Sequence, residues 1–307
     1  MSKTVFLFPG QGSQYAGMGK SLALQFPAAK AVFEEADDVL GFAISKLCFE
    51  GPEEELKLTE NTQPALVATS IAALAVLNEL GHSPDFVAGH SLGEYSALVA
   101  VGSLKLSDAL RLVRNRGRYM QQAVPQGVGA MAALLKLPEG KLHEILQTAA
   151  EGEVVTAANL NSPDQIVIAG HATAVARAME LAKLAGAKRA ILLPVSAPFH
   201  CPLMIPAQTL LKPDLEATHF ADLSIPLVNN WQGHLIHSGD LARIGLFEQV
   251  PNPVRWTESI RKLIELGGSR WIEVGPGAVL GGLLKNIDGN HKAIKFGEAD
   301  DLPALQL

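Results

Sequence analysis

Ser91 lies in a sequence pattern that is typical of serine nucleophiles. Residues 89–93 read Gly-His-Ser-Leu-Gly, which is a Gly-x-Ser-x-Gly motif. Residues 86–88 are apolar enough for a short buried strand, and residues 94–100 have a helix-compatible composition. A serine on a tight turn between a strand and a helix has an exposed hydroxyl above the helix N-terminus. The bare motif also arises by chance in a chain with 28 glycines, but the flanking strand and helix favour Ser91 as a nucleophile.

A serine nucleophile needs a base within hydrogen-bond distance, and nine histidines are available. The side chain of His90 should leave the turn in another direction from Ser91. Three others lie at expected element ends and should be at the surface: His82, His143 and His171. A simple hydrolase would use a late histidine with an acid before it, such as His237 or His291, but no motif surrounds either one. His200 lies in a proline-flanked loop, residues 194–202.

A glycine-containing loop, residues 9–14, follows the first expected strand, residues 4–8. Residues 19–21 look like the end of a phosphate-binding Walker A loop, but Gln14 stands where that loop needs glycine. Tyr15 likewise interrupts a dinucleotide-binding Gly-x-Gly-x-x-Gly pattern. The loop can instead supply a backbone N–H to a neighbouring site, and an oxyanion hole needs such a donor.

The composition of the chain excludes several classes of protein. Its 307 residues are 48% hydrophobic and 18% charged, which is typical of a globular α/β protein with one or two domains. A net charge of −6 argues against nucleic-acid binding. The apolar run at residues 65–77 is too short to cross a membrane and predicts a buried helix. The N-terminus resembles no signal peptide, so we expect a cytoplasmic protein, with Cys48 and Cys201 as free thiols.

The order of elements predicts two subdomains. We expect residues 1–126 and 197–307 to form a large α/β-hydrolase-like catalytic subdomain with a central parallel sheet. Its helices should include residues 53–80, with a start signal at 61–64, and residues 107–122, with Ser107 as the cap. A break rich in glycine and proline at residues 125–129 precedes an inserted subdomain at residues 127–196.

The inserted segment has a strand and helix order of βαββαβ, which is the ferredoxin-like arrangement. The expected strands are residues 130–135, 154–159, 165–169 and 189–195. The expected helices are residues 138–150 and 172–185, and a turn is expected at residues 161–164.

Several short motifs, in order along nearly the whole chain, resemble one acyltransferase family. This family includes the malonyl-CoA:acyl-carrier-protein transacylases of bacterial fatty-acid synthesis and the acyltransferase domains of polyketide synthases. The motifs occupy residues 8–14, 89–94, 116–117, 120–121, 161–163, 196–200, 252–256 and 273–277. Several independent motifs in order are far more specific than a single serine turn.

The resemblance implies a catalytic dyad of Ser91 and His200. A backbone carbonyl at Gln249, in place of a carboxylate, would orient the imidazole. The backbone N–H groups of Gln11 and Leu92 would form the oxyanion hole. The expected reaction has two halves, in which malonyl-CoA acylates the serine and the phosphopantetheine thiol of acyl carrier protein then removes the malonyl group. We expect no metal and no redox cofactor, and a monomeric enzyme.

The resemblance also implies three substrate-binding residues. The expected helix at residues 107–122 carries four arginines, which usually form a solvated face. Only Arg116 carries the Arg-Gly motif of the family, and its guanidinium would pair with the free carboxylate of the malonyl group. Phe199 would occupy the space that a 2-methyl branch on the substrate needs. Met120 is a further pocket position.

Three other functions compete with this interpretation. A stand-alone acyltransferase of a polyketide pathway would have the same chemistry. A thioesterase of the α/β-hydrolase kind would share the serine turn but would need an acid–histidine pair late in the chain and no Arg116. A carrier-protein docking scaffold would not need both Ser91 and His200.

Overall fold

A six-stranded sheet forms the centre of the larger part of the molecule. The computed structural model describes residues 2–195 and 197–306. The strands of this sheet are β1 (Lys3–Phe8), β2 (Phe86–Gly89), β7 (Leu227–Val228), β8 (Leu235–Ile236), β9 (Gly268–Val274) and β10 (Ala293–Phe296). Their order is β10-β9-β1-β2-β7-β8, and all neighbours are parallel except β7 and β8. The predicted central parallel sheet is therefore confirmed.

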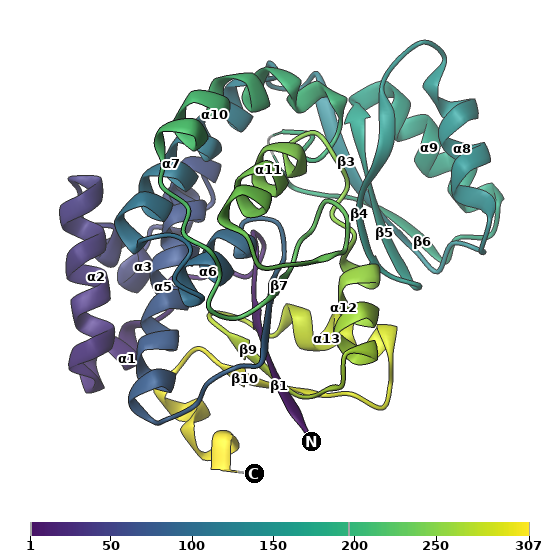
Figure 1. Cartoon of the computed structure of the whole chain (residues 1–307). Coiled ribbons are helices and arrows are strands. Elements are labelled where there is room, and N and C mark those ends of the chain that lie inside the picture. The colour runs from purple at the N-terminus through teal and green to yellow at the C-terminus, as the bar shows by residue number, and fades with distance from the viewer. Residues whose placement is uncertain (1, 196, 307) are drawn as a thin grey trace.

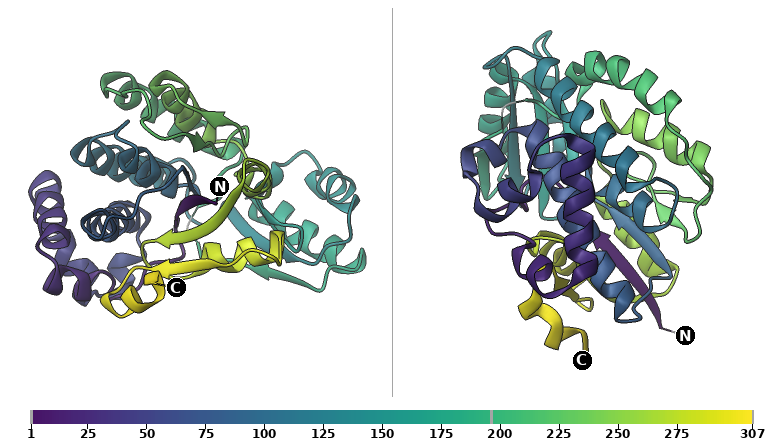
Figure 2. Two further views of the ribbon diagram at one scale, coloured as in Figure 1. Left: turned by 60° about the horizontal axis from the view of Figure 1, so that its bottom comes forward. Right: turned by 90° about the vertical axis from the view of Figure 1, so that its left-hand side faces the viewer.

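Helices cover both faces of this sheet (Figures 1 and 2). The helices before the small sheet are α1 (Lys20–Gln25), α2 (Pro27–Leu40), α3 (Ile44–Glu50), α4 (Glu53–Leu56), α5 (Thr59–Glu79), α6 (Gly93–Ala100) and α7 (Leu106–Gln122). Those after it are η1 (Pro202–Met204), α10 (Ile205–Ala217), α11 (Gly239–Gln249), α12 (Trp256–Glu265), α13 (Val279–Ile287) and η2 (Ala299–Gln306). Within residues 2–195 and 197–306, none has both the length and the apolar composition needed to cross a membrane.

Strand β1 shows why the sheet is buried on both sides. Successive side chains of a strand point to opposite faces. Phe6 and Phe8 accordingly pack into the core formed with α2, α5 and α7, whereas Val5 and Leu7 pack into the core formed with α12 and α13. A strand buried on both faces reads as a continuous apolar run, as residues 5–8 do.

A second sheet of four antiparallel strands lies beside the first (Figure 1). Its strands are β3 (Gly129–Leu135), β4 (Val155–Ser162), β5 (Gln165–His171) and β6 (Arg189–Leu192), in the order β4-β5-β3-β6. Helices α8 (Lys141–Ala150) and α9 (Ala172–Leu184) cover one face, where Ala132, Leu134 and Ile168 are buried. Met131 and Ala133 point to the other face and belong to the main hydrophobic core. The small sheet therefore packs against the larger part of the molecule through this second face.

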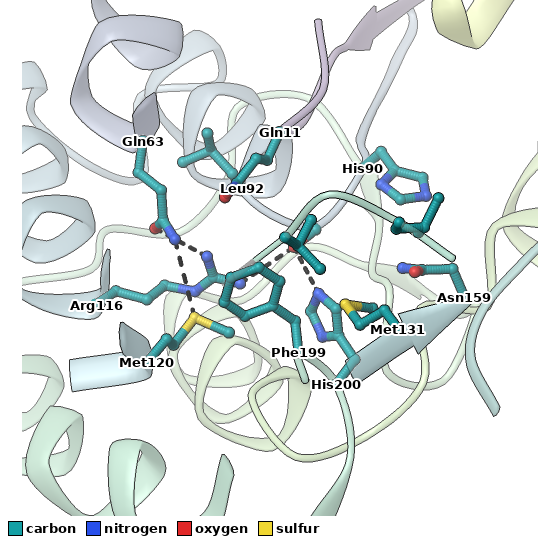
Figure 3. Close-up of a pocket in the computed structure, with 13 residues that line it drawn as sticks. Gln11, Gln63, His90, Leu92, Arg116, Met120, Met131, Asn159, Phe199 and His200 are labelled. Carbon is teal, nitrogen blue, oxygen red and sulfur yellow. Dashed lines mark hydrogen bonds between the residues drawn. The ribbon is translucent and has the colours of Figure 1, made fainter. Parts of the chain in front are cut away.

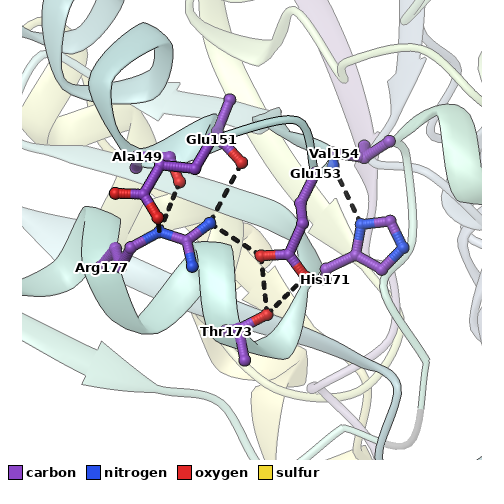
Figure 4. Close-up of polar contacts among 8 residues, drawn as sticks. Ala149, Glu151, Glu153, Val154, His171, Thr173 and Arg177 are labelled. Atoms are coloured by element: carbon purple, nitrogen blue, oxygen red, sulfur yellow. Dashed lines mark hydrogen bonds and ion pairs between the residues drawn. The ribbon is translucent and has the colours of Figure 1, made fainter.

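Arg177 of α9 ties the two helices of the small sheet together (Figure 4). Its guanidinium donates to the carbonyl oxygens of Ala149 and Ala150 at the end of α8, at 2.8 and 3.0 Å, and to Glu153 at 2.7 Å. Glu153 also accepts a hydrogen bond from Thr173. The last carbonyls of a helix have no partner inside the helix, so this arginine stabilises the C-terminus of α8.

Two helix starts in the larger part of the molecule differ from the sequence-based expectation. Helix α5 begins at Thr59, and the expected start signal at residues 61–64 lies inside its first two turns. Pro64 has no N–H to donate to the carbonyl of Glu60, and Arg114 donates to that oxygen instead, at 2.7 Å. A side chain of α7 thus replaces the backbone hydrogen bond that Pro64 cannot make. Helix α7 begins at Leu106, so Ser107 lies within the helix and is not its cap.

The small sheet also differs in detail from the expected element bounds. Helix α8 begins at Lys141, three residues after the proline expected to start it. Strand β4 continues to Ser162, which shortens the expected turn to residues 163–164. Strand β6 ends at Leu192, before the expected residue 195. The order of strands and helices nevertheless matches the prediction.

Candidate active site

Ser91 lies on a strained turn between β2 and α6. Its backbone φ is +51°, a conformation that side-chain-bearing residues rarely adopt. The glycines on either side are required by close packing, because a Cβ at Gly89 would lie 1.9 Å from the carbonyl oxygen of Gly93, and one at Gly93 would lie 2.1 Å from that of Phe8. The predicted strand–turn–helix is confirmed, and it presents the hydroxyl of Ser91 to a cavity.

The imidazole of His200 connects Ser91 to the backbone of Gln249. The Nε2 atom of His200 lies 2.7 Å from Ser91 Oγ, and its Nδ1 atom lies 2.8 Å from the Gln249 carbonyl oxygen. A carbonyl oxygen can only accept, so Nδ1 carries the proton and Nε2 accepts the hydrogen bond from the serine hydroxyl. This tautomer is the one that a general base for Ser91 requires.

The surroundings of His200 keep its imidazole neutral. Burial, together with the positive charge of Arg116, lowers the pKa of His200 to about 3, while the hydrogen bond to Gln249 opposes this shift. His200 as a whole is only 3% exposed. The lone pair on Nε2 is therefore available to accept a proton at neutral pH.

The backbone N–H groups of Gln11 and Leu92 are available to a ligand. Both residues line the cavity that contains Ser91 and His200. Gln11 comes from the loop after β1, and Leu92 directly follows Ser91 at the N-terminus of α6. Within the part of the chain that the structure describes, neither N–H donates a hydrogen bond to the protein. Two such donors beside a nucleophile can stabilise a developing oxyanion.

Arg116 lies in the same cavity, and no carboxylate of residues 2–195 and 197–306 forms an ion pair with it. Arg116 is 2% exposed, and its guanidinium donates from Nη1 to Gln63 at 2.9 Å and from Nη2 to Gln249 at 3.0 Å. Nη2 also lies 3.2 Å from Ser91 Oγ. Figure 3 shows Arg116 and His200 approaching the same region from opposite sides. Gln63, Gln249 and Ser91 are all neutral, so the guanidinium can bind an anionic group next to the serine.

Close packing of α5 against α7 brings Gln63 to Arg116. A Cβ on Gly117 would lie 2.7 Å from the Cα of Glu60 on α5. Only glycine allows this approach, which explains why a glycine follows the arginine in the Arg-Gly motif. The side-chain oxygen of Gln63 then faces the guanidinium across the two helices.

The cavity next to Ser91 has a volume of about 110 Å³. Phe199 and Met120 form part of its wall, and Met131, Leu193 and Val195 contribute from the side of the small sheet. Phe199 is 8% exposed and directly precedes His200. The cavity adjoins a larger hollow of about 750 Å³, because both are lined by Gln11, His90, Asn159, Leu193 and Val195. The site thus has a small acyl-sized compartment and a wider approach.

The remaining histidines take no part in the dyad. His90 turns away from Ser91, and its Nε2 lies 2.8 Å from Asn161 Oδ1. His143 is exposed as expected, but His82 and His171 are half-buried, and His171 accepts a hydrogen bond from the N–H of Val154 at 2.9 Å. His291 packs against Trp271. Ser196, which belongs to a motif of the family, lies outside the described residues.

Sequence reasoning missed three side chains behind the site. Glu94 Oε2 accepts hydrogen bonds from Gln249 Nε2 at 2.8 Å and from the Asn230 N–H at 3.0 Å. Asn230 Oδ1 accepts the N–H of Ser91 at 2.6 Å. Burial raises the pKa of Glu94 to about 7, and the hydrogen bonds oppose this rise. Glu94 directly follows the serine motif and could have been suspected, whereas no motif marks Asn230, and Gln63 lay in a segment interpreted as a helix start.

A cavity with these groups can receive an acyl group on Ser91 and pass it on. The fold and the site together fit the class of acyl transferases, with Ser91 placed where such an enzyme has its nucleophile. The described part of the chain contains no cluster of three or more His, Cys, Asp or Glu side chains that could hold a metal ion.

Comparisons with known proteins agree with this class. Residues 5–295 match the acyl transferase domain family. The malonyl CoA-acyl carrier protein transacylase of Bacillus subtilis is 50% identical over 303 residues, which cover 98% of this chain and 96% of that protein. The chain belongs to the malonyl CoA-acyl carrier protein transacylases of the acyl transferase domain family, as the sequence motifs predicted.

The solved structures that resemble this chain include members of the same family. The acyl carrier protein S-malonyltransferase of Vibrio cholerae is 44% identical and superimposes with a TM-score of 0.96, covering 99% of this chain and all of that one. A malonyl-transacylase solved in complex with a type II PKS acyl-carrier protein is 45% identical, with a TM-score of 0.96, and covers 99% of this chain and 98% of its own.

Proposed function

We propose that this protein transfers the malonyl group from malonyl-CoA to the phosphopantetheine thiol of acyl carrier protein, through a malonyl ester on Ser91. The protein is an acyltransferase that supplies malonyl groups for fatty-acid synthesis. The observation that carries the proposal is the position of Arg116, whose Nη2 lies 3.2 Å from the Ser91 hydroxyl. An acyl group that carries its own carboxylate matches this placement.

In the first half-reaction, His200 Nε2 removes the hydroxyl proton as Ser91 Oγ attacks the thioester carbon of malonyl-CoA. The N–H groups of Gln11 and Leu92 stabilise the resulting oxyanion. As the intermediate collapses, the carbon–sulfur bond breaks, and the imidazolium gives its proton to the departing CoA thiolate. CoA leaves as a thiol, and the malonyl group remains on Ser91 as an ester.

In the second half-reaction, the phosphopantetheine thiol of acyl carrier protein attacks this ester. His200 accepts the thiol proton and returns a proton to Ser91 Oγ as the ester bond breaks. Both the starting compound and the product are thioesters of similar energy, so the reaction is reversible. The partner is supported by the structural neighbour that was solved with an acyl-carrier protein bound.

Arg116 selects a malonyl group over an acetyl group. The planar guanidinium offers two parallel N–H donors that match a carboxylate. When Ser91 is acylated, the Nη2 donor that lies near the free hydroxyl becomes available to the malonyl carboxylate. Phe199 restricts the space beside the α-carbon, and Met120 lines the same compartment.

We also propose that the reaction uses no metal and no other cofactor, because His200 transfers the protons and backbone N–H groups stabilise the negative charge. A monomeric enzyme and a cytoplasmic location remain predictions.

We further propose that residues 1–126 and 197–307 form an α/β-hydrolase-like subdomain, which the strand–turn–helix at Ser91 supports. Residues 127–196 form a ferredoxin-like insertion in this proposal, which the βαββαβ order and the strand order β4-β5-β3-β6 support.

One assay separates this function from its competitors. The protein is mixed with malonyl-CoA labelled in the malonyl group, with and without holo-acyl carrier protein. The expected result is label on the protein alone at first, followed by transfer to the carrier protein. A thioesterase would instead release free malonate without carrier protein, and a docking scaffold would bind the carrier without taking up label. Comparing carrier proteins of fatty-acid and polyketide pathways as acceptors then identifies the pathway.

A further inference from the structure

Glu94 is a fully buried carboxyl group that does not line the substrate cavity. It is the second residue of α6, three positions after Ser91, and its side chain has no solvent exposure. Burial of a carboxyl group is costly unless hydrogen bonds stabilise it. The reaction described above gives Glu94 no role in proton transfer, so its place behind the nucleophile needs another explanation.

The carboxylate of Glu94 holds the side-chain amide of Gln249. Gln249 Nε2 donates to Glu94 Oε2 at 2.8 Å and to the carbonyl oxygen of Ser91 at 3.0 Å. On its other side, Gln249 Oε1 accepts from Arg116 Nη2 at 3.0 Å. The Gln249 amide therefore bridges the carboxylate and the guanidinium.

Glu94 is the only charged acceptor that Gln249 Nε2 contacts in the described part of the chain, and together with the Ser91 carbonyl oxygen and Asn230 Oδ1 it sets the orientation of this amide. An ionised carboxylate only accepts hydrogen bonds, and a guanidinium only donates them. With Nε2 toward Glu94 and Oε1 toward Arg116, both contacts are satisfied. In the reversed orientation, the amide nitrogen would face the guanidinium and the amide oxygen would face the carboxylate, so both contacts would be lost.

The orientation of the amide in turn fixes the guanidinium of Arg116. Gln63 accepts from Nη1 at 2.9 Å and Gln249 accepts from Nη2 at 3.0 Å, so the two terminal nitrogens are held by two different elements. A guanidinium held at both ends keeps its plane, and a bidentate pair with a carboxylate depends on that plane. A group held in place before the substrate arrives loses less entropy on binding.

We propose that Glu94 is a positioning residue for malonyl transfer, which acts through the side-chain amide of Gln249 to hold Arg116 ready for the substrate carboxylate. The inference rests on the proposed function, because it assumes that Arg116 binds the malonyl carboxylate. It assigns to Glu94 a role in substrate selection and gives the Gln249 side chain a role separate from that of its backbone carbonyl.

Three variants of Glu94 separate this role from a purely structural one. E94Q keeps an oxygen that can accept the same two hydrogen bonds. E94M has a similar volume but accepts none. E94D keeps the charge but withdraws the oxygens by about one carbon–carbon bond, ~1.5 Å. Glu273 offers a matched control, because it is also buried and its carboxylate accepts the N–H groups of Leu280 and Gly281, neither of which lines the compartment next to Ser91.

The measurement is the ratio of acylation kcat/KM for malonyl-CoA to that for acetyl-CoA, at pH 8, with unfolding temperatures recorded for all variants. Loss of one buried hydrogen-bond partner should lower the ratio about 10-fold in E94M. The ratio should also fall in E94D. E94Q should restore the ratio to within about threefold of the parent. E273Q and E273M should leave the ratio unchanged, even where they lower stability.

Two results would overturn the inference. One is an equal loss for both substrates in E94M and E94D, because acetyl-CoA has no carboxylate for Arg116 to bind. The other is an E94Q ratio as low as that of E94M. If E94M does not fold, the test rests on the malonyl-to-acetyl ratio of E94D, and a ratio in E94D equal to that of the parent contradicts the inference. A parent protein that forms no malonyl ester would instead contradict the proposed function.

Discussion

His200 donates its Nδ1 proton to the backbone carbonyl oxygen of Gln249, across 2.8 Å, and this carbonyl takes the place of the carboxylate of a catalytic triad. A carbonyl orients the imidazole and selects its tautomer, but it carries no full negative charge to stabilise an imidazolium. The buried ring and the nearby Arg116 both disfavour protonation, so the resting base is neutral.

This arrangement predicts an unusual pH dependence. Because the pKa of His200 is lowered to about 3, its neutral form persists when the pH falls below the ordinary histidine value of about 6.5. The acylation kcat/KM should therefore show no loss centred near pH 6.5 that is due to this base. Stopped-flow acylation between pH 5 and 8 measures this, and the same series in E94Q removes Glu94, a buried group whose pKa of about 7 lies in this range. An acid limb at pH 6.5 in both proteins would contradict it.

Replacing His200 tests its role as the base. H200A should lower the acylation rate by about 10⁴- to 10⁶-fold, because removing one member of a nucleophile–base pair typically costs that much. The neighbouring Cys201 is the control. Its thiol donates to the Pro198 carbonyl at 3.0 Å, a bond that serine can also make, so C201S should keep near-parent rates. The opposite ranking of the two variants would require a different base.

Arg116 should control the choice between malonyl and acetyl groups. Losing a buried charge-assisted pair with a carboxylate costs about 2–5 kcal/mol, so R116A should lose most of its activity with malonyl-CoA. Acetyl-CoA has no carboxylate and should lose little or even gain. The control is R118A, on the same helix with a side chain 54% exposed, which should change neither rate. Equal losses for both substrates in R116A would mean that the arginine is structural.

Phe199 should limit the size of the substituent on the α-carbon of the substrate. It lines the acyl compartment, so F199S should raise methylmalonyl transfer relative to malonyl transfer by about 10- to 200-fold, the range that one methyl group allows. F199L keeps most of the bulk and should change the ratio less. Competition between the two CoA esters, read as the ratio of acyl-enzyme masses at early time, measures the effect. An unchanged ratio in F199S would mean that Phe199 does not set this selectivity, and Met120 and Leu92 would be the next positions to test.

The features that could be predicted from the sequence are those encoded by neighbouring residues. The turn at Ser91 needs only a strand, two glycines and a helix within about fifteen positions, and the βαββαβ order follows from local periodicity. The strand order of the large sheet was not predictable in this way, because β1 pairs with β9 from the other end of the chain.

The contacts within the site also join residues that are far apart in the sequence, so local patterns could not predict them. Ser91 and His200 are 109 positions apart, and only the family motifs related them. Pro64 led to the wrong predicted start for α5, because a proline is more often found at the beginning of a helix than inside it. Gln63 therefore lies within a predicted start signal, residues 61–64, and nothing in the sequence relates it to Arg116. Asn230 supports the Ser91 turn from a segment without any motif, so only the three-dimensional structure places it there.

The central claim is that Ser91 carries the malonyl group between the two thioesters. Intact-mass measurement of the parent protein after mixing with malonyl-CoA should show one malonyl adduct, and adding holo-acyl carrier protein should remove it. The S91A variant should show no adduct, because the intermediate has no other attachment point. A full malonyl adduct on S91A, or a parent adduct that holo-acyl carrier protein fails to discharge, would contradict the account.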